Sequence, residues 1–247
     1  DPAKVKEKLA EGNFDAITFV HNETSIGLAN PIREIMAAVR EFPDVVSIVD
    51  TVSSFGAQEI NKDGLGIDIM LTGIQKSLAL PPGLALISVS RKAHSRAKYC
   101  LHRGFYFDLL EYQKFHEEGL TPSTPALSLI AALNWRCDQI EKEGLENRYA
   151  RHAAMNKHVS EWCEARGFPL FAPEGFRSVT VVCAKNEKYV DLEELNKRLK
   201  LNHSMMINTG YGKLKGKTFR ISTMGDESVN SLKELTDNLD KVLATLR

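Results

Sequence analysis

Residues 67–77, Ile67-Asp68-Ile69-Met70-Leu71-Thr72-Gly73-Ile74-Gln75-Lys76-Ser77, decide the fold, because an apolar run leads directly into a polar turn. Residues 16–20, 45–49 and 84–89 form similar runs that are nearly continuous in apolar side chains. Runs of this kind are typical of strands that are covered on both faces of a sheet. We therefore expect four such strands, two of which end in polar turns that carry Asp50 and Lys76.

Helical patterns alternate with these strands. Residues 31–41 are predicted to form a helix whose apolar face consists of Ile32, Ile35, Met36 and Val39. This alternation favours an α/β fold with a mostly parallel sheet. Two more helices are predicted over residues 126–140 and 146–166, and short strands and helices then continue to a last helix that ends near Leu246. The break between the two long helices divides the chain into a large domain, residues 1–142, and a smaller α+β domain, residues 143–247.

The composition indicates a small-molecule ligand. The chain has 247 residues, 43% of them hydrophobic, and its 32 basic and 32 acidic residues leave no net charge that would favour a nucleic-acid partner. No apolar run approaches the roughly 20 residues of a membrane span. The four cysteines show no zinc-ligand spacing, which favours a reducing, cytoplasmic location. Because the chain begins with Asp1 and not with Met, an organellar targeting signal stays open.

Three polar segments follow the predicted strands, at residues 21–27, 50–54 and 72–76. Ligands bind beyond the carboxyl ends of strands in open α/β sheets, so we expect these segments to converge. A lysine and an aspartate at two strand ends supply what a pyridoxal phosphate enzyme needs, an amine for the Schiff base and a carboxylate for the pyridinium nitrogen. Each residue alone has an ordinary explanation, since Asp50 could cap a turn and Lys76 could be solvated. The mainly apolar residues 77–84 argue against an ordinary surface lysine.

Other chemistries lack their motifs. No Gly-x-Ser-x-Gly sequence surrounds Ser53 or Ser54, which argues against a serine hydrolase. No Gly-x-Gly-x-x-Gly sequence precedes Asp50, which argues against a dinucleotide site. His152 and His158 are not spaced to share a helix face, so we expect no metal site there.

Together these segments resemble the class V aminotransferases of pyridoxal phosphate fold type I, in particular the alanine–glyoxylate and serine–pyruvate aminotransferases. The resemblance rests on the order and spacing of the motifs at residues 21–27, 49–56, 66–68, 73–78 and 81–83. It implies that Lys76 forms the Schiff base, that Asp50 pairs with the ring nitrogen, and that Thr24 bonds the ring hydroxyl. It also implies that Val52 packs under the ring and that Gln75 lies beside the cofactor.

The resemblance extends to the substrates and the assembly. It implies that Arg220, in Phe219-Arg220-Ile221-Ser222, binds the carboxylate of a small amino acid such as alanine or serine, with glyoxylate or pyruvate as the 2-oxo acid acceptor. Without the resemblance, Arg220 could equally lie on an exposed strand face. It further implies a homodimer in which Thr121, Ser123 and Thr124 reach the cofactor phosphate of the partner. Capping of the next helix by Ser123 or Thr124 would explain those residues equally well.

The chain also departs from the family pattern. The glycine-rich phosphate loop and the ring-stacking aromatic residue of the family would lie upstream of Asp1, so we expect that about the first third of a longer protein is missing. Ile74 stands where relatives often carry a small polar residue. Two other functions stay open: another class V enzyme, such as a cysteine desulfurase or a lyase, and a non-catalytic dimerisation module. A desulfurase needs a cysteine on a mobile loop, whereas Cys137 and Cys163 are predicted on helices and Cys183 in a strand.

Overall fold

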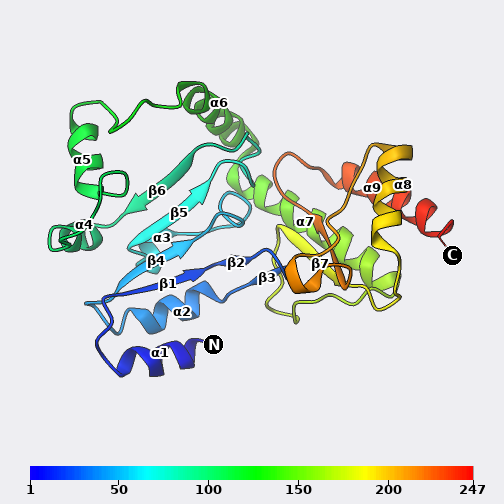
Figure 1. The fold of residues 1–247 in the computed structure, drawn as a ribbon, viewed down its shortest axis with the longest axis horizontal. Helices are drawn as coiled ribbons and strands as arrows, with labels where there is room; N and C mark the ends of the chain where they lie inside the picture. Colours follow the sequence, from blue (N-terminus) through cyan, green and yellow to red (C-terminus); the bar gives the residue numbers. More distant parts are fainter. Residues whose placement is uncertain (247) are drawn as a thin grey trace.

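A four-stranded sheet organises the first part of the chain in the computed structural model, which describes residues 1–246 (Figure 1). Its strands lie in the order β1, β4, β5 and β6; the first three are parallel, and β6 is antiparallel to β5. The predicted α/β architecture with a mostly parallel sheet is therefore confirmed. The strands are β1 (Ala16–Val20), β4 (Val46–Asp50), β5 (Ile69–Gly73) and β6 (Ala85–Val89).

Coverage of this sheet is uneven. β4 is buried along most of its length, whereas β1 and β6 keep exposed residues. Ile87 in the middle of β6 is 51% exposed. The expectation that all four strands are covered on both faces is therefore wrong for β1 and β6. The physical reason is that β1 and β6 are the edge strands of the sheet within residues 1–246.

Helices α1 (Pro2–Ala10) and α2 (Ile32–Val39) pack together along one side of the sheet (Figure 1). The predicted helix over residues 31–41 is confirmed, and its four apolar residues are all buried. Met36 and Val49 are fully buried in the core that α2 forms with the sheet. The remaining elements of this part are β2 (Asn22–Glu23), β3 (Leu28–Ala29), α3 (Lys62–Leu65), α4 (Arg91–Ala97) and α5 (Leu109–Glu117).

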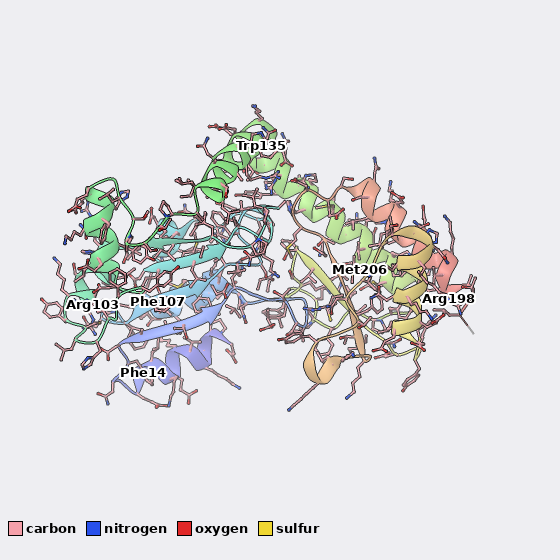
Figure 2. All side chains as sticks on the ribbon, turned by 45° about the horizontal axis from the view of Figure 1, so that its top comes forward. Phe14, Arg103, Phe107, Trp135, Arg198 and Met206 are labelled. Atoms are coloured by element: carbon pink, nitrogen blue, oxygen red, sulfur yellow. The ribbon has the colours of Figure 1, made fainter. Side chains whose placement is uncertain are left out.

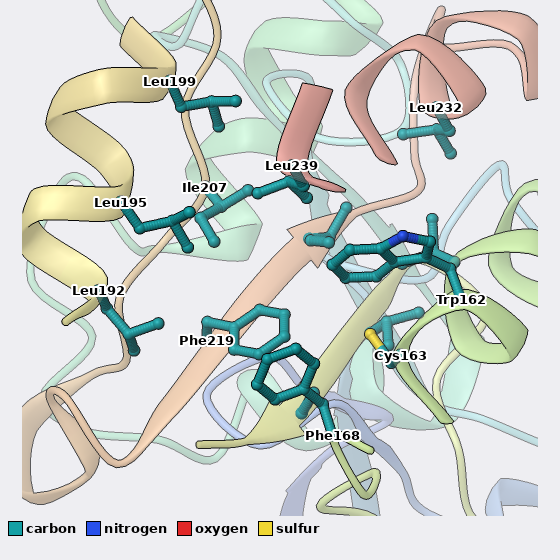
Figure 3. Close-up of a cluster of buried hydrophobic side chains, with 14 of the residues drawn as sticks. Trp162, Cys163, Phe168, Leu192, Leu195, Leu199, Ile207, Phe219, Leu232 and Leu239 are labelled. Carbon is teal, nitrogen blue, oxygen red and sulfur yellow. The ribbon is translucent and has the colours of Figure 1, made fainter. Parts of the chain in front are cut away.

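The second part has its own small sheet, in which β7 (Val181–Lys185) and β8 (Thr218–Ser222) are antiparallel. Helices α8 (Leu192–His203) and α9 (Val229–Leu243) pack beside it, and η1 (Gly212–Leu214) is a short 3-10 turn. Figure 3 shows its core, where the Phe168 ring meets the Phe219 ring edge to face at 5.1 Å and stacks on Trp162 at 6.3 Å. Helix α9 ends a few residues before the predicted Leu246.

Two long helices, α6 (Leu127–Glu143) and α7 (Leu145–Ala165), lead from the first sheet to the second (Figure 1). Both are confirmed. They meet at Gly144, whose φ of +80° lies in the region that favours glycine. The hydrophobic core of the first part of the chain and that of the second part share no residue. We therefore propose a domain boundary between residues 142 and 143. Within residues 1–246, none of the helices is long and apolar enough to cross a membrane.

Candidate active site

A cavity of about 1020 Å³ lies between the carboxyl edge of the four-stranded sheet and the second part of the chain. Thr24, Gln75 and Lys76 line it from the first part. Arg220 of β8 and two loops, at residues 204–208 and 224–227, line it from the second part. Met206, labelled in Figure 2, is exposed on the first of these loops. Four of the predicted site residues therefore meet at one cavity, although they are far apart in the sequence.

Lys76 lies in a tight turn that follows β5. The Ala79 amide donates to the Lys76 carbonyl at 2.9 Å, and the Leu80 amide donates to the Ile74 carbonyl at 3.1 Å. Ile74 is fully buried, which anchors the turn in the core while the partly buried Lys76 side chain lines the cavity. Gly73 leaves room for the Gln75 side-chain amide, which would have to move aside if a Cβ were present at that position.

Asp50 ends β4, which is the strand next to β5. Because these two strands are parallel, Asp50 and Lys76 come from the same edge of the sheet. The Val52 amide donates to Asp50 Oδ1 at 2.7 Å and thus folds the chain into a turn. No other side-chain hydrogen bond to the Asp50 carboxylate occurs within the described part of the chain, which leaves Oδ2 able to accept one. Asp50 and Val52 are both partly buried.

Thr24 connects the two walls of the cavity. Its Oγ1 lies 2.7 Å from Ser53 Oγ, in the turn that carries Asp50. Its carbonyl accepts a hydrogen bond from Arg220 Nη1 at 2.8 Å. Asn22 supports the same place, because its Nδ2 donates to the Ser53 carbonyl at 3.0 Å. Hydrogen bonds thus bring the polar segments at 21–27 and 50–54 together, and Gln75 and Lys76 of the segment 72–76 line the same cavity as Thr24.

Arg220 is held in place before any ligand binds. Its Nε donates to Asn208 Oδ1 at 3.2 Å, and the guanidinium carbon lies 5.8 Å from the centre of the Tyr211 ring. The side chain is partly buried and lines the cavity, so it does not lie on an exposed strand face. A planar guanidinium oriented in this way suits recognition of a carboxylate.

Thr121, Ser123 and Thr124 lie apart from this cavity. All three are exposed, and Thr121 Oγ1 donates to the Ser123 carbonyl at 2.6 Å. The alternative explanation, that Ser123 or Thr124 caps α6, is wrong, because Ala126 occupies the N-cap position and no side chain caps the helix. The helix begins beyond Pro125, which places both hydroxyls too far upstream.

No role in the site was predicted for three buried polar residues near it, His21, Arg148 and His152. His21 Nδ1 lies 3.0 Å from Ser54 Oγ, and burial lowers the pKa of His21 to about 4. Arg148 and His152 of α7 are almost fully buried, and Arg148 is hydrogen-bonded to the Ser77 carbonyl. No sequence pattern marked Arg148, because an arginine on a helix is usually solvated.

The residues present fit pyridoxal phosphate on its ring side. Lys76 offers an amine and Thr24 a hydroxyl at the cavity, and Asp50 offers a carboxylate in the neighbouring turn, although it does not line the cavity itself. In addition, Ser77 Oγ and Asn22 Oδ1, in the segments next to the cavity, are buried without a hydrogen-bond partner in residues 1–246. Of the residues predicted to bind the cofactor, Thr24, Gln75 and Lys76 line this cavity, whereas Thr121, Ser123 and Thr124, which were predicted for a partner's phosphate, do not.

Comparison with known proteins agrees with this arrangement. The family model described as Aminotransferase class-V matches residues 1–221. An uncharacterized aminotransferase of Methanocaldococcus jannaschii is 45% identical over 228 residues, which cover 91% of this chain and 59% of that protein. The serine–glyoxylate aminotransferase of Arabidopsis thaliana is 35% identical over 223 residues, which cover 89% of this chain and 55% of that protein.

The fold matches solved structures equally well. The crystal structure of an alanine–glyoxylate aminotransferase from Nostoc sp. superposes with a TM-score of 0.91 at 27% identity and covers 98% of this chain and 65% of that one. The chain therefore spans between 55% and 65% of the length of these three proteins. The predicted resemblance is confirmed: the chain belongs to the class-V aminotransferase family and has the fold of the type I pyridoxal phosphate enzymes.

Proposed function

We propose that the protein is a pyridoxal phosphate-dependent aminotransferase that moves an amino group from a small amino acid, alanine or serine, to glyoxylate or pyruvate. The observation that carries the proposal is the meeting of Thr24, Lys76 and Arg220 at one cavity. An amine and a guanidinium that face one space are suited to a substrate with both an amino and a carboxylate group. The relatives named for serine–glyoxylate and alanine–glyoxylate exchange support the choice of substrates.

In this proposal, residues of the sheet edge hold the cofactor. Asp50 would pair with the ring nitrogen through its carboxylate, and Thr24 Oγ1 would bond the ring hydroxyl. Val52 would pack under the ring, and Gln75 would lie beside the cofactor. When bound, pyridoxal phosphate supplies an electron-withdrawing ring that makes the Cα proton of the substrate acidic.

The chain's own groups then handle the substrate. Arg220 binds the carboxylate, and its existing contacts with Thr24 and Asn208 keep the guanidinium oriented while it does so. Lys76 Nζ would hold the cofactor, and the same nitrogen, once free, would move the proton at the substrate Cα as general acid and base.

The proposal includes a homodimer. Six large apolar side chains, 57–89% exposed, form an apolar patch on residues 99–120: Tyr99, Leu101, Phe105, Tyr106, Phe107 and Leu120. Figure 2 shows Phe107 on this segment, at the far side of the molecule from Met206. Exposed apolar side chains gathered on one segment favour a protein partner. Thr121, Ser123 and Thr124 continue directly from the patch, so a second copy bound there would bring these hydroxyls toward its own cofactor phosphate.

The cysteines bear on two further parts of the proposal. Burial raises the pKa of the Cys163 thiol to about 12 and also raises the pKa of Cys183, which makes both poor nucleophiles. Cys100 and Cys137 are exposed but do not line the cavity. This arrangement favours transamination over cysteine desulfuration. Because all four cysteines are free thiols, a cytoplasmic location is also part of the proposal.

The first test is to trap the cofactor. The protein is incubated with pyridoxal phosphate, reduced with borohydride and mapped by peptide mass spectrometry. We expect a reduced adduct at Lys76 in the wild type and in the control Lys98→Ala, whose lysine is exposed on the surface. We expect no adduct at that position in Lys76→Ala. Alanine or serine should then bleach the visible absorption of the loaded wild type, with pyruvate or hydroxypyruvate as product.

Three outcomes would contradict the proposal. Equal labelling of Lys76 and the surface lysines would mean that the site does not select the cofactor, which favours a non-catalytic dimerisation module. Full turnover by Lys76→Ala would exclude this lysine as the acid and base. Release of sulfide from cysteine by the loaded protein would favour the desulfurase alternative.

A further inference from the structure

Arg148 is a buried arginine to which the proposed reaction gives no role. Its side chain is 1% exposed, yet all three guanidinium nitrogens are engaged. Nε donates to the Gly56 carbonyl at 2.8 Å, and Nη2 donates to the Ser77 carbonyl. Nη1 donates to Glu143 Oε2 at 2.8 Å, which supplies the opposite charge that a buried arginine needs.

The carbonyls that Arg148 binds belong to the two turns of the candidate site. Ser77 is the residue after Lys76, and Gly56 ends the segment that begins at Asp50. A single rigid guanidinium thus joins the turn that presents the amine to the turn that presents the carboxylate. Neither turn has a regular strand or helix of its own to fix it at this point.

The next residues of α7 hold the opposite wall of the cavity. Arg151 Nη1 donates to the carbonyls of Gly225 and Glu227, at 3.1 Å and 2.5 Å. The Gly225 amide donates to His152 Nε2 at 3.2 Å. This loop follows β8, the strand that carries Arg220. It also lies against the lysine turn, because a Cβ at Gly225 would meet Ala79 Cβ at 3.3 Å.

Glu143 connects the two sets of contacts. Its Oε1 accepts from Arg151 Nε at 2.6 Å, while its Oε2 accepts from Arg148 Nη1. Hydrogen bonds from Arg151 and then Arg148 lower the pKa of the Glu143 carboxyl, although burial opposes them. The carboxylate therefore stays charged and keeps both arginines in place.

We infer that Arg148, held by Glu143, is a positioning residue that fixes the turn carrying Lys76 relative to the Asp50 turn and the Arg220 wall. The inference rests on the proposed function, since it assigns Arg148 to the orientation of the same amine. A planar fork can hold two carbonyls and a carboxylate at once. Lysine has the same charge but only one nitrogen, so it cannot reproduce that geometry.

The test compares Arg148→Lys and Glu143→Gln with a matched control, Arg166→Lys. Arg166 follows α7 and pairs with Asp240 at 2.7 Å on the surface, away from the cavity. The first readout is the ratio of the borohydride-reduced pyridoxal phosphate adduct at Lys76 to that at Lys98. We expect Arg148→Lys and Glu143→Gln to lower this ratio by about tenfold or more, because small displacements of a reacting group carry large rate penalties. The control should keep the wild-type ratio.

The second readout needs no cofactor. Hydrogen exchange of the backbone amides at residues 74–80 should become faster in Arg148→Lys and Glu143→Gln and stay unchanged in the control. In Glu143→Gln the Gly225 amide should also exchange faster, because Arg151, which binds the Gly225 carbonyl, loses its charged partner. Reductive methylation with formaldehyde reports how accessible Lys76 is and should change little, since orientation and not exposure is lost.

The outcomes separate the two proposals. If the wild type itself shows no preference for Lys76, the proposed function fails, and amide exchange alone decides the inference. Unchanged exchange at 74–80 in both variants would overturn it, and faster exchange would support it. A lower thermal unfolding temperature with a wild-type adduct ratio and wild-type exchange would show that Arg148 is only structural. If Arg148→Lys does not fold, Glu143→Gln gives the same readouts.

Discussion

Asp68 should stabilise the sheet at the edge opposite the cavity. Its side chain is 7% exposed and lies just before β5. The carboxylate accepts from the Ser47 amide at 3.0 Å, from Ser90 Oγ at 2.7 Å and from Lys92 Nζ at 2.7 Å. These bonds join β4, β5 and the start of α4. Asp68→Asn keeps the shape of the side chain but removes its charge.

The expected loss follows from these contacts. Hydrogen bonds to a charged group contribute roughly 1.5–3 kcal/mol. Lys92 is 39% exposed and also reaches the Val45 carbonyl, so it can be solvated after the change and adds little to the loss. We therefore expect the free energy of unfolding to fall by about 2 kcal/mol, which corresponds to a decrease of roughly 4–8 °C in Tm. The matched control, Asp63→Asn, changes a carboxylate that is 95% exposed and should cost less than about 0.5 kcal/mol.

The effect should depend on pH. Burial alone would raise the pKa of Asp68, but hydrogen bonds from Lys92, Ser47 and Ser90 outweigh it and lower the pKa. A carboxyl group whose pKa is lowered by folding stabilises the protein above its unfolded pKa, which is about 3.9, and loses that contribution as the pH falls through the folded value. Thermal unfolding should thus separate wild type from Asp68→Asn most at neutral pH and less below about pH 4. An equal gap at pH 7 and pH 3, or a variant as stable as Asp63→Asn, would refute this reasoning.

Three further predictions concern the cavity, the second core and the apolar patch. Arg220→Lys should weaken alanine binding by about tenfold to a hundredfold, because a bidentate carboxylate contact is lost. The alanine concentration needed to bleach the bound cofactor measures this loss. The surface control, Arg198→Lys, should behave as wild type. Leu239→Ala should lower the free energy of unfolding in urea by about 3–4 kcal/mol, since Leu239 is fully buried, and a loss below about 1 kcal/mol would contradict its place in the core. Phe107→Glu should shift the protein toward monomer in sedimentation experiments, whereas Tyr189→Glu, at a residue 91% exposed elsewhere, should not.

Local patterns were sufficient to predict most of the fold. The strand at 16–20 and the helices around 31–41, 126–140 and 146–166 follow from hydrophobic periodicity, which depends only on nearby residues. The coverage of β1 and β6 could not be predicted in this way. An apolar run indicates that a strand forms, but strand order decides whether it lies inside the sheet or at its edge. The interpretation of Ser123 or Thr124 as a cap of α6 was also wrong, because the helix begins only after Pro125.

The candidate site was predictable where its residues follow strands. Parallel strands bring their carboxyl ends together, so Asp50 and Lys76 could be expected at one edge. The partners that fix them are different. Arg148 lies 71 positions from Ser77 in the sequence, and its charge carries no sign that it will be buried. Only the packing of α7 against the turns shows that this arginine belongs to the site.

The two ends of β5 have different roles: residues at the amino end stabilise the sheet, and residues at the carboxyl end belong to the candidate site. At the amino edge, Asp68 has all its hydrogen bonds satisfied by neighbouring elements. At the carboxyl edge, Ser77 Oγ and Asn22 Oδ1 are buried without a partner in the described residues. Buried polar groups that lack a partner are costly, so an edge that carries them needs support from elsewhere. Arg148 and Glu143 provide that support from α7, which is why we expect their loss to alter the reactivity of Lys76 and the loss of Asp68 to alter only stability.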